Sequence, residues 1–480
     1  MTMQASSIFE PKARGVFIKS TKIPATNKDA FDYHTREGAL ERLVPTWSIL
    51  GATSHEGNIR DGAISTLKVS LWPISFKWTA AHFGFLQDRQ FQDKMVKGPF
   101  QSWIHTHSFI PDEIGHCIME DKIAYSPPFG KLGPILLNDT IQNNLNQLFH
   151  YRHRILINDI NLWKIARRSK AQKILITGSH GLIGSSLIPL LTVAGEHKIT
   201  RLSRPSSNRN NTNSHSIVWD PSDDKVNVKE LEGFDVVIHL AGENIFGRWT
   251  DSKKQRILKS RINSTRLLCD SLIKLANPPS TLICASATGF YGNQGNEVLT
   301  EESKPGFGFL SDVCQKWEES TETARDAGIR VVNTRFGVVL TPKGGMLQKL
   351  LTLSRFGLSL RLGDENQYIS WVSIEDVIGS IFYSIINSSI RGPVNVVSPN
   401  PVTNLEFSKT LARIVKSKIM LPISQKVARM MLGELADAMI RSSALVVPNK
   451  LSSAGYRFVN PDLEDAFRLL LGRQQIISQE

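Results

Sequence analysis

The sequence has little of what marks a secreted or membrane-spanning protein. Its 480 residues include only four cysteines, with no CxxC pair and no His/Cys cluster, so neither a disulfide scaffold nor a zinc site is indicated. No run of 18 apolar residues occurs, and Met1–Glu10 has no basic residue followed by an apolar core. We therefore predict no membrane span and no secretory leader, and we expect a cytoplasmic protein.

A dedicated nucleic-acid-binding region is also missing. The formal net charge is +13, but the excess of Lys and Arg is spread along the chain, without a basic tail or a basic-aromatic motif. This distribution argues against a nucleic-acid partner and is compatible with attraction to an anionic small molecule such as a dinucleotide. Nothing in the sequence indicates the oligomeric state.

The length of the chain predicts more than one domain, because single hydrophobic cores stop growing at roughly 250–300 residues. A basic segment, INLWKIARRSKAQ, separates two regions with different hydrophobic patterns and marks the expected boundary. We predict a first domain over residues 1–165, a second over 173–400 and a C-terminal part over 401–480.

Before the boundary, apolar residues alternate in short runs, which is typical of strands. A helix-like stretch over Asn143–Leu156 follows them. The pattern predicts an α+β domain in which a curved antiparallel sheet wraps around a long closing helix. The expected strands are Gly15–Ser20, Ser65–Trp72, Phe76–Ala80, Ser102–Phe109 and His116–Tyr125.

After the boundary, strand and helix patterns alternate. The apolar runs KILITG, KITRLSR, SIVWD, DVVIHLAG, TLICASATGFYG and IRVVNTRFGVVL are separated in several places by helical segments, including long ones at about Asp251–Leu275 and Leu310–Ala327. Such alternation predicts an α/β fold with a doubly wound parallel sheet covered on both faces.

A glycine-rich turn joins the first of these strands to a helix in KILITGSHGLIGSSL. Gly178 would allow the tight turn, Gly181 the approach of backbone to a pyrophosphate, and Gly184 the close packing of helix on strand. The helix N-terminus, with Leu182 and Ile183, would offer unpaired N–H groups to the phosphates. The turn predicts a bound dinucleotide.

The second strand suggests which dinucleotide. It ends in Arg201-Leu202-Ser203-Arg204, where an NAD-preferring site would carry an acidic residue for the ribose 2′-hydroxyl. A serine and an arginine suit a 2′-phosphate instead, because a guanidinium holds it through paired hydrogen bonds. We therefore expect NADP as the cofactor and consider NAD the less favoured alternative.

Several motifs extend this interpretation. The glycine spacing, HLAGEN and CASATGFYG resemble the extended short-chain dehydrogenase/reductase superfamily, and GENIFGRWTDSKKQRILKSRINSTR, TRFGVVLTPKGG and SWVSIEDV resemble its atypical, sugar-nucleotide-epimerase-like branch. The tail from LGELADAMIRSS onward is similar to the C-terminal domain of that branch. Together the resemblance covers nearly all of residues 173–480.

This resemblance implies roles for particular residues. It implies cofactor contacts at Gly178, Gly181, Gly184, Ser203, Arg204, Ala241 and Gly242, with an adenine-side contact at Asp220. Ser286 and Thr288 fall where the superfamily keeps a hydroxyl that polarises a substrate carbonyl, and Tyr291 would line the same pocket. The alternative is that these are ordinary hydroxyls at the end of a strand.

The sequence departs from the superfamily at its catalytic pair. The YxxxK motif should fall in GFLSDVCQKWEES, which contains no tyrosine. Aligning on Glu318 places Leu310 and Cys314 at the two positions, and a shift by one places Phe309 and Val313 there; none can fill the roles of Tyr and Lys. Cys314 is either a thiol acidified by the helix N-terminus or a small buried residue. Lys316 lies on another helical face.

The first domain resembles the polyketide-cyclase/START-like (SRPBCC) superfamily through FDYHTREGALERLVPTW, WPISFKWTAAH, FQDKMVKGPFQSWIHTHSF and LNQLFHYRH. The resemblance implies a helix-grip fold that encloses a hydrophobic ligand, although the same alternation fits a domain without a ligand. The candidate pocket residues are Trp72, Trp78, Phe100, Trp103, His105 and His107.

A metal site is not predicted from the histidines of this domain. His105 and His107 would share one face of a strand, but the sequence offers them no third ligand. His34, His150 and His153 follow no metal-binding spacing.

These observations favour an NADP-binding oxidoreductase or epimerase-like protein whose first domain captures a small, hydrophobic substrate. Because the catalytic Tyr and Lys are missing, a non-catalytic protein that binds or senses a dinucleotide is the main alternative. A third hypothesis is a sugar-nucleotide epimerase proper, which would need a substitute base. The sequence does not identify the substrate.

Overall fold

The computed structural model describes most of the chain as two compact units. The first comprises Met1–Asn161 with Gln474–Glu480, and the second comprises Leu162–Arg473. The described residues are 13–47, 51–56, 58–71, 74–130, 132–167, 170–205, 216–223, 225–362, 366–423, 429–430, 434 and 443–474.

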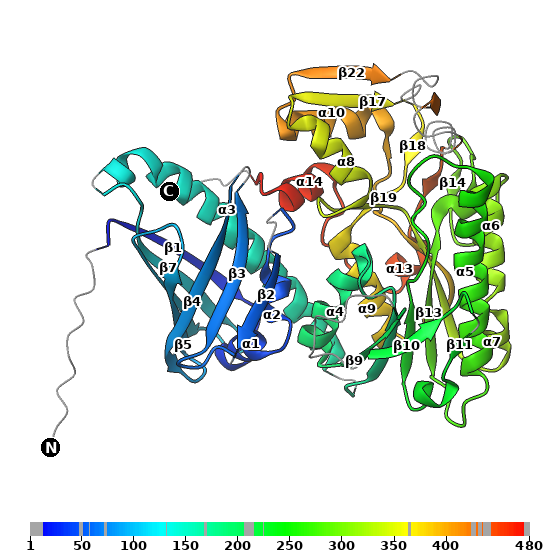
Figure 1. The fold of residues 1–480 in the computed structure, drawn as a ribbon, viewed down its shortest axis with the longest axis horizontal. Helices are drawn as coiled ribbons and strands as arrows, with labels where there is room; N and C mark the ends of the chain where they lie inside the picture. Colours follow the sequence, from blue (N-terminus) through cyan, green and yellow to red (C-terminus); the bar gives the residue numbers. More distant parts are fainter. Residues whose placement is uncertain are drawn as a thin grey trace. The chain divides into compact units, whose positions relative to one another are not determined.

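The first unit is an antiparallel sheet with a long helix, as the hydrophobic pattern predicts (Figure 1). The strand order is β1-β7-β6-β5-β4-β3-β2. Helices α1 (Asn27–Thr35) and α2 (Ala39–Leu43) connect β1 to β2, and α3 (Leu132–Ala166) follows β7. The strands are β1 (Gly15–Ile23), β2 (Gly51–Glu56), β3 (Ile64–Leu71), β4 (Ile74–Leu86), β5 (Gln90–Lys97), β6 (Ser102–Pro111) and β7 (Cys117–Ser126).

Some elements of this unit are absent from the sequence prediction. Strands β2 and β5 and the two short helices are additional, and α3 is more than twice as long as the predicted Asn143–Leu156. The two unpredicted strands pair irregularly. The β4–β5 pairing shifts register between Phe83 and Leu86, and the β2–β3 pairing shifts between Gly51 and Ser54. Such shifts disturb the strict alternation on which a strand prediction depends.

Helix α3 is attached to the rest of the unit by apolar contacts and by a buried ion pair. Phe149 packs against Phe17 of β1 with ring centroids 5.4 Å apart. Further along the helix, Asp159 accepts hydrogen bonds from Nε and Nη2 of Arg42, both at 2.8 Å, and from the Tyr33 hydroxyl at 2.8 Å. The Asp159 side chain is fully buried, so this bidentate pair ties α1 and α2 to α3 in a low-dielectric interior.

The second unit contains the predicted doubly wound parallel sheet, with strand order β11-β10-β9-β8-β12-β13-β15-β20. Among the described pairings of this sheet, only the short one between β10 and β11 is antiparallel. The strands are β8 (Lys173–Thr177), β9 (Lys198–Ser203), β10 (Ser216–Asp220), β11 (Lys225–Val226), β12 (Val236–His239), β13 (Thr281–Ala287), β15 (Arg330–Phe336) and β20 (Gly392–Val396).

Helices cover both faces of this sheet (Figure 1). Helices α4 (Leu182–Gly195) and α9 (Ile374–Ile386) pack on one face, and α5 (Asp251–Leu272) packs on the other. The single helix predicted over Leu310–Ala327 is instead two, α6 (Phe309–Glu319) and α7 (Glu322–Asp326). The break follows from local hydrogen bonds, because the hydroxyls of Ser320 and Thr321 donate to the carbonyls of Lys316 and Glu318.

The C-terminal segment is interleaved with earlier parts of the second unit. Its strands β21 (Val402–Thr403), β22 (Ile419–Ile423) and β23 (Leu445–Val446) pair with β18 (Tyr368–Ile369), β17 (Leu358–Leu362) and β14 (Val298–Leu299). The remaining elements are β16 (Val338–Leu340), β19 (Trp371–Ser373), α8 (Gly345–Ser354), α10 (Asn404–Val415), α13 (Asn449–Ser453), α14 (Leu463–Leu471), η1 (Val228–Leu231) and η2 (Thr288–Tyr291).

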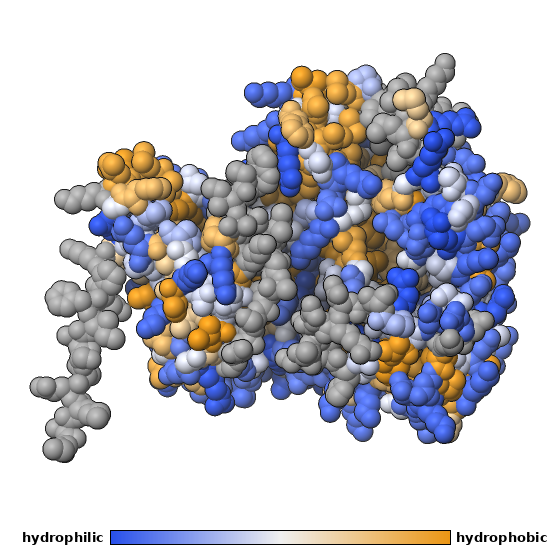
Figure 2. Space-filling view, viewed as in Figure 1, coloured by the Kyte–Doolittle hydropathy of each residue, from blue (hydrophilic) through white to orange (hydrophobic). Residues whose placement is uncertain are grey.

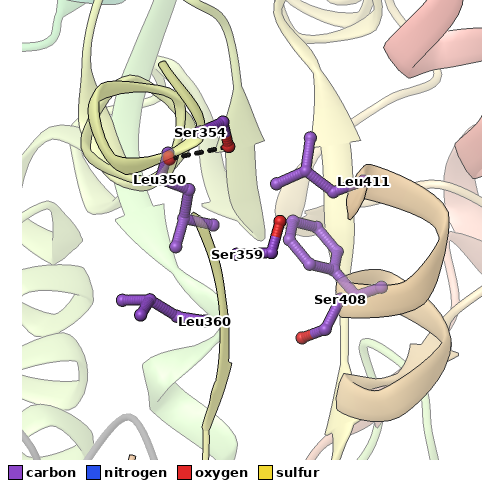
Figure 3. A pocket seen from close by; sticks show the side chains of 7 residues that line it. Leu350, Ser354, Ser359, Leu360, Ser408 and Leu411 are labelled. Atoms are coloured by element: carbon purple, nitrogen blue, oxygen red, sulfur yellow. Dashed lines mark hydrogen bonds between the residues drawn. The ribbon is translucent and has the colours of Figure 1, made fainter. Parts of the chain in front are cut away.

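A small pocket lies among α8, β17 and α10 (Figure 3). Leucine side chains and serine hydroxyls line it, and the Ser354 hydroxyl donates to the Leu350 carbonyl at 3.1 Å. No ionisable side chain is among its lining residues, so this pocket offers no acid or base. The lining residues are Leu350, Ser354, Ser359, Leu360, Phe407, Ser408 and Leu411.

The visible surface is largely hydrophilic, with hydrophobic groups over the first turns of α3 and over β17 and β22 (Figure 2). In the first turns of α3, the exposed apolar side chains are Leu132, Ile135 and Leu136. Within the described residues, no helix combines the length and the apolar character that a membrane crossing requires.

A buried histidine links the ends of β8 and β12. The backbone N–H groups of Leu240 and Ala241 donate to Thr177 Oγ1 at 3.1 and 3.2 Å, which leaves the Thr177 hydroxyl proton for Nδ1 of His239, 2.8 Å away. The Nε2–H of His239 then faces Ser264 Oγ at 3.4 Å. This network assigns the neutral Nε2–H tautomer, and burial lowers the pKa of His239 to about 4.

We expect the Asp159→Asn substitution to lower the free energy of unfolding of the first unit by about 3–5 kcal/mol, because it removes the negative charge that Asp159 places against the buried Arg42 guanidinium. Chemical denaturation followed by peptide-resolved hydrogen exchange would measure the loss. The matched control is Asp32→Asn, which removes a surface pair with Lys28 and should change little. Equal effects of the two substitutions would contradict this account of α3.

His239 predicts a pH dependence for the second unit. Its folded pKa lies below the unfolded value, so its stabilising contribution is complete above about pH 6.5 and is lost as the pH falls towards 4. Within that window, wild type should lose about 1.4 kcal/mol per pH unit more than His239→Gln, which does not titrate. The measurement is the unfolding free energy of both proteins as a function of pH. If the two curves had the same slope between pH 6.5 and 4, His239 would take up a proton in the folded state, which would contradict this prediction.

Candidate functional site

The sheet of the second unit reverses its winding direction at β8. Strand β8 lies between β9 and β12, so successive connections leave it in opposite directions. In open parallel sheets this switch point forms a crevice at the carboxyl ends of the strands, where ligands bind. Both the glycine turn after β8 and the Ala241-Gly242 pair after β12 lie at this edge.

Glycine occupies the three positions of the turn for different structural reasons. Gly178 has φ +67°, and a Cβ there would lie 2.7 Å from the Leu240 carbonyl carbon. A Cβ on Gly184 would come within 2.4 Å of the Gly178 carbonyl oxygen. Gly181 caps α4, is exposed and meets only that same oxygen at 3.1 Å. Gly178 and Gly184 are therefore required by packing, while Gly181 leaves backbone open to a ligand.

The first turn of α4 is also held from outside. Leu182 and Ile183 are half-buried there. Gly344, at the start of α8, lies so close to Leu182 that a Cβ would approach its Cδ1 to 2.8 Å. The first turn of α4 thus packs against a glycine about 160 residues later in the chain.

The predicted ribose-side residues lie at the ends of β9 and β10. Ser203 is half-buried, with its hydroxyl 3.2 Å from that of Ser216, and Arg204 is exposed at the end of β9. Asp220 Oδ1 accepts hydrogen bonds from the backbone N–H and the hydroxyl of Ser222, so this carboxylate stabilises its own turn. The polar loop that follows Arg204, residues 206–215, lies outside the described residues.

The three predicted catalytic side chains are not equally accessible. Ser286 is buried and donates to Glu318 Oε1 at 2.6 Å. Tyr291 is fully buried, and its hydroxyl donates to Asn395 at 2.7 Å and accepts from Arg335 Nη1 at 2.9 Å. Burial raises the pKa of Tyr291. Thr288 is only half-buried, with a weak 3.4 Å hydrogen bond to the Phe336 carbonyl.

A buried ion pair that the sequence analysis did not assign connects these residues. Arg335 donates to both carboxylate oxygens of Glu318 at 2.8 Å, and its guanidinium lies 3.5 Å from the centroid of the Phe290 ring. Burial opposes the charge on Arg335, but the hydrogen bonds and charge interactions with Glu318 and Tyr291 together outweigh it and raise the pKa of Arg335. Ser286 and Tyr291 are therefore fixed from opposite sides by one Glu318–Arg335 pair. The motif TRFG contained Arg335, but only the fold shows its partner.

The position expected for the catalytic lysine holds an inert thiol. Cys314 is buried on α6 with its sulfur close to Gly289, and burial raises its pKa to about 12. The hypothesis of a thiol acidified by the helix N-terminus is therefore wrong, because loss of solvation dominates. Lys316, on the same helix, is exposed and does not replace it.

Arg261 is a further basic residue beside the crevice. A Cβ on Gly242 would lie 3.5 Å from its guanidinium carbon, and its Nη1 donates to the carbonyls of Glu243 and Ile257 at 3.1 Å. The guanidinium also stacks over Trp317, 5.0 Å from the ring centroid. This arginine is part of the motif GENIFGRWTDSKKQRILKSRINSTR, but nothing in the sequence distinguished it from the other basic residues of α5.

In the first unit, the candidate pocket residues form two groups. Trp78, Phe100 and Trp103 pack edge to face, with the two indole rings 5.0 Å apart, while Trp72 lies outside the described residues. His105 and His107 belong to a buried cluster with Asp93 and Asp121. Burial opposes protonation of His105, but hydrogen bonds to Asp121 and Asp93 raise its pKa to about 9.

The histidine cluster corrects one expectation. The sequence showed no third ligand for His105 and His107, yet Asp93 of the adjacent strand faces both. Cross-strand neighbours are set by register, which the sequence does not display. His153 joins this cluster through Asp121, and the His34 ring lies 6.0 Å from that of His107.

Comparison with known proteins places the second unit in a family. Residues 174–396 match the NAD dependent epimerase/dehydratase family, and residues 425–470 match a domain of unknown function (DUF1731). An epimerase family protein of Mycobacterium bovis is 37% identical over 61% of this chain and 95% of its own length. One from Bacillus subtilis is 36% identical over 63% of this chain and 99% of its own length.

Two solved structures resemble the chain. A nucleoside-diphosphate sugar epimerase from Corynebacterium glutamicum shares 31% identity, with a TM-score of 0.76 over 96% of this chain and 91% of that one, so the likeness includes the first unit. The human epimerase family protein SDR39U1 with NADPH shares 27% identity, with a TM-score of 0.58 over 63% of this chain and all of that one. The chain therefore belongs to the NAD-dependent epimerase/dehydratase family, and it carries the DUF1731 domain at its C-terminal end.

Proposed function

We propose that the second unit binds NADP(H) and acts as an oxidoreductase or epimerase-like enzyme on a small molecule. The observation that carries this proposal is the glycine turn at the switch point, where Gly178 and Gly184 are packed too tightly for any side chain. Around it, Leu182 and Ile183 begin α4, whose N-terminus suits a pyrophosphate.

The preference for NADP over NAD rests on the end of β9. Ser203 and Arg204 stand where a carboxylate would accept the ribose 2′-hydroxyl of NAD. An exposed guanidinium at this edge would instead hold a 2′-phosphate. The structure of the human relative contains NADPH, which supports the same choice.

For catalysis, bound NADP(H) would supply the hydride donor or acceptor. Thr288 is the most exposed of the three predicted hydroxyls, so it is the one that can donate a hydrogen bond to a substrate oxygen. Ser286 and Tyr291 act at a distance, because their hydroxyls are engaged by Glu318, Arg335 and Asn395. These two hold the end of β13 and η2 in place, which positions Thr288.

A non-catalytic role in binding or sensing a dinucleotide is the second candidate. It is supported by the side chains at the expected Tyr and Lys positions, Leu310 and the inert thiol of Cys314. The two candidates share the cofactor site and differ only in whether a hydride is transferred.

For the first unit, we propose a START-like role in binding a hydrophobic small molecule that the second unit uses. One support is the antiparallel sheet with its long helix. Another is the aromatic group Trp78, Phe100 and Trp103, in which the two tryptophans offer apolar area and an N–H donor. The likeness to the Corynebacterium structure covers this unit but leaves its ligand open.

Arg204→Ala tests the cofactor. Titration of the purified protein, followed by fluorescence of the reduced nicotinamide, should show a Kd for NADPH about ten- to a hundredfold higher than in wild type, because charge-assisted hydrogen bonds to the 2′-phosphate are lost. The Kd for NADH should hardly change. Arg325→Ala on α7, close to the amino end of β15, is the matched control. Equal weakening of both cofactors would disprove a 2′-phosphate contact at Arg204.

Thr288→Val tests catalysis without knowledge of the substrate. NADPH deuterated at its hydride position would be incubated with the protein and a small-molecule cell extract, and transfer of deuterium would be followed by mass spectrometry. The substitution should slow transfer by about 10²–10³-fold if Thr288 stabilises the substrate oxygen. Thr352→Val, an exposed site on α8, should leave the rate unchanged. Tight NADPH binding with no transfer in wild type would favour the sensing role.

A further inference from the structure

Three adjacent strands of the first unit, β5, β6 and β7, bring charged side chains together on one face of the sheet. Asp93 pairs directly with His105 across β5 and β6, and Asp121 pairs with His107 across β6 and β7. Residues two apart on a strand share a face, so His105 and His107 point the same way. Helix α3 contributes His153, whose Nε2 lies 2.5 Å from Asp121 Oδ2.

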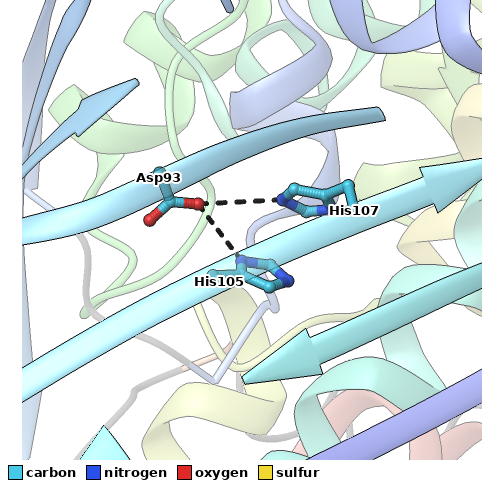
Figure 4. Close-up of side chains that lie close together, drawn as sticks. All are labelled: Asp93, His105 and His107. Carbon is cyan, nitrogen blue, oxygen red and sulfur yellow. Dashed lines mark ion pairs between the residues drawn. The ribbon is translucent and has the colours of Figure 1, made fainter. Parts of the chain in front are cut away.

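The atoms of Asp93, His105 and His107 that face one another have the spacing of a metal site (Figure 4). Asp93 Oδ2 lies 3.2 Å from His105 Nδ1 and 3.8 Å from His107 Nε2. One ligand atom from each of the three residues lies within 4.8 Å of the others. With metal–ligand bonds of about 2.1 Å, two tetrahedral ligands are about 3.4 Å apart. The two observed distances bracket that value.

The second nitrogen of each imidazole, on the side away from Asp93, has the same neighbour. His105 Nε2 and His107 Nδ1 lie 3.0 and 2.6 Å from the same oxygen, Oδ1 of Asp121. A histidine that binds a metal through one nitrogen almost always directs the other towards a carboxylate, carbonyl or water. Asp121 therefore occupies the position of the carboxylate that orients metal-binding imidazoles.

The cluster is buried, with Asp121 0%, His105 5% and His107 8% exposed. His105 Nδ1 and His107 Nε2 both face the carboxylate of Asp93, while the other nitrogen of each ring faces Asp121. Buried charges in proteins are paired with one another or coordinate a metal. Two carboxylates on opposite sides of two imidazoles fit the second arrangement.

We propose that Asp93, His105 and His107 bind a divalent first-row transition-metal ion, with Asp121 orienting both imidazoles. Two imidazoles and one carboxylate suit Zn²⁺, Fe²⁺ or Co²⁺, whereas Mg²⁺ and Ca²⁺ prefer oxygen ligands. Binding through His105 Nδ1 requires that this nitrogen carry no proton, so any proton there leaves to solvent. The site is separate from the dinucleotide crevice, since all of its residues belong to the first unit.

The test is the metal content of the full chain after expression in medium supplemented with zinc and iron. Elemental analysis of protein purified without chelators should find about one equivalent of metal in wild type. His105→Gln and Asp93→Asn should each reduce this at least tenfold. His116→Gln, in the turn between β6 and β7, is the matched control and should retain wild-type content.

A second measurement uses wild-type protein, so it does not require that any variant folds correctly. Wild type refolded with Co²⁺ should show the d–d absorption of a bound ion without thiolate charge transfer, and X-ray absorption should show imidazole and oxygen scatterers. Mg²⁺ should not compete. The proposal is overturned if wild type contains no metal and takes up no Co²⁺ on refolding. It is equally overturned if correctly folded variants keep the metal or if sulfur ligands are found.

Discussion

The close approach of Gly184 to the carbonyl of Gly178 is the constraint on which the second unit depends. Because a Cβ at position 184 would lie 2.4 Å from that oxygen, α4 can begin directly against the end of β8 only if both residues are glycine. The N-terminus of the helix thereby lies at the edge of the sheet where β8 and β12 end side by side. The Thr177 hydroxyl fixes the opposite wall through Leu240, Ala241 and His239.

Sequence reasoning succeeded where one local pattern encodes both structure and chemistry. The turn at Gly178–Gly184 carries its own strand and helix, both present in the structure, so about fifteen residues indicate the fold, and the same residues predict the ligand class. It was less complete where the site depends on partners distant in the chain. Glu318 and Arg335 are 17 residues apart and meet Tyr291 and Asn395 only after four separate segments converge. Their pairing explains why Ser286 and Tyr291 are buried rather than free in a pocket.

In the first unit the limit was strand register. Alternation identifies which residues share a face of β6, and it correctly placed His105 and His107 together. It does not reveal that Asp93 and Asp121 stand opposite them, because β5 was not recognised and a shift of one residue would turn every side chain to the other face. The expected pocket of Trp, Phe and His side chains missed these carboxylates for the same reason.

The Glu318–Arg335 network and the Asp93–His105–His107 cluster use buried charge differently, and the difference separates support from function. In the second unit, Arg335 uses its donors on Glu318 and Tyr291, while Tyr291 donates onward to Asn395, so the network is closed and holds its surroundings rigid. In the first unit, Asp93 and Asp121 converge on the same two imidazoles, so that Asp121 orients one nitrogen of each ring while the other nitrogen faces Asp93. A guanidinium paired with a carboxylate needs no ligand to explain it. Two imidazoles that are oriented by one carboxylate and face a second one are arranged as the ligands of a metal ion.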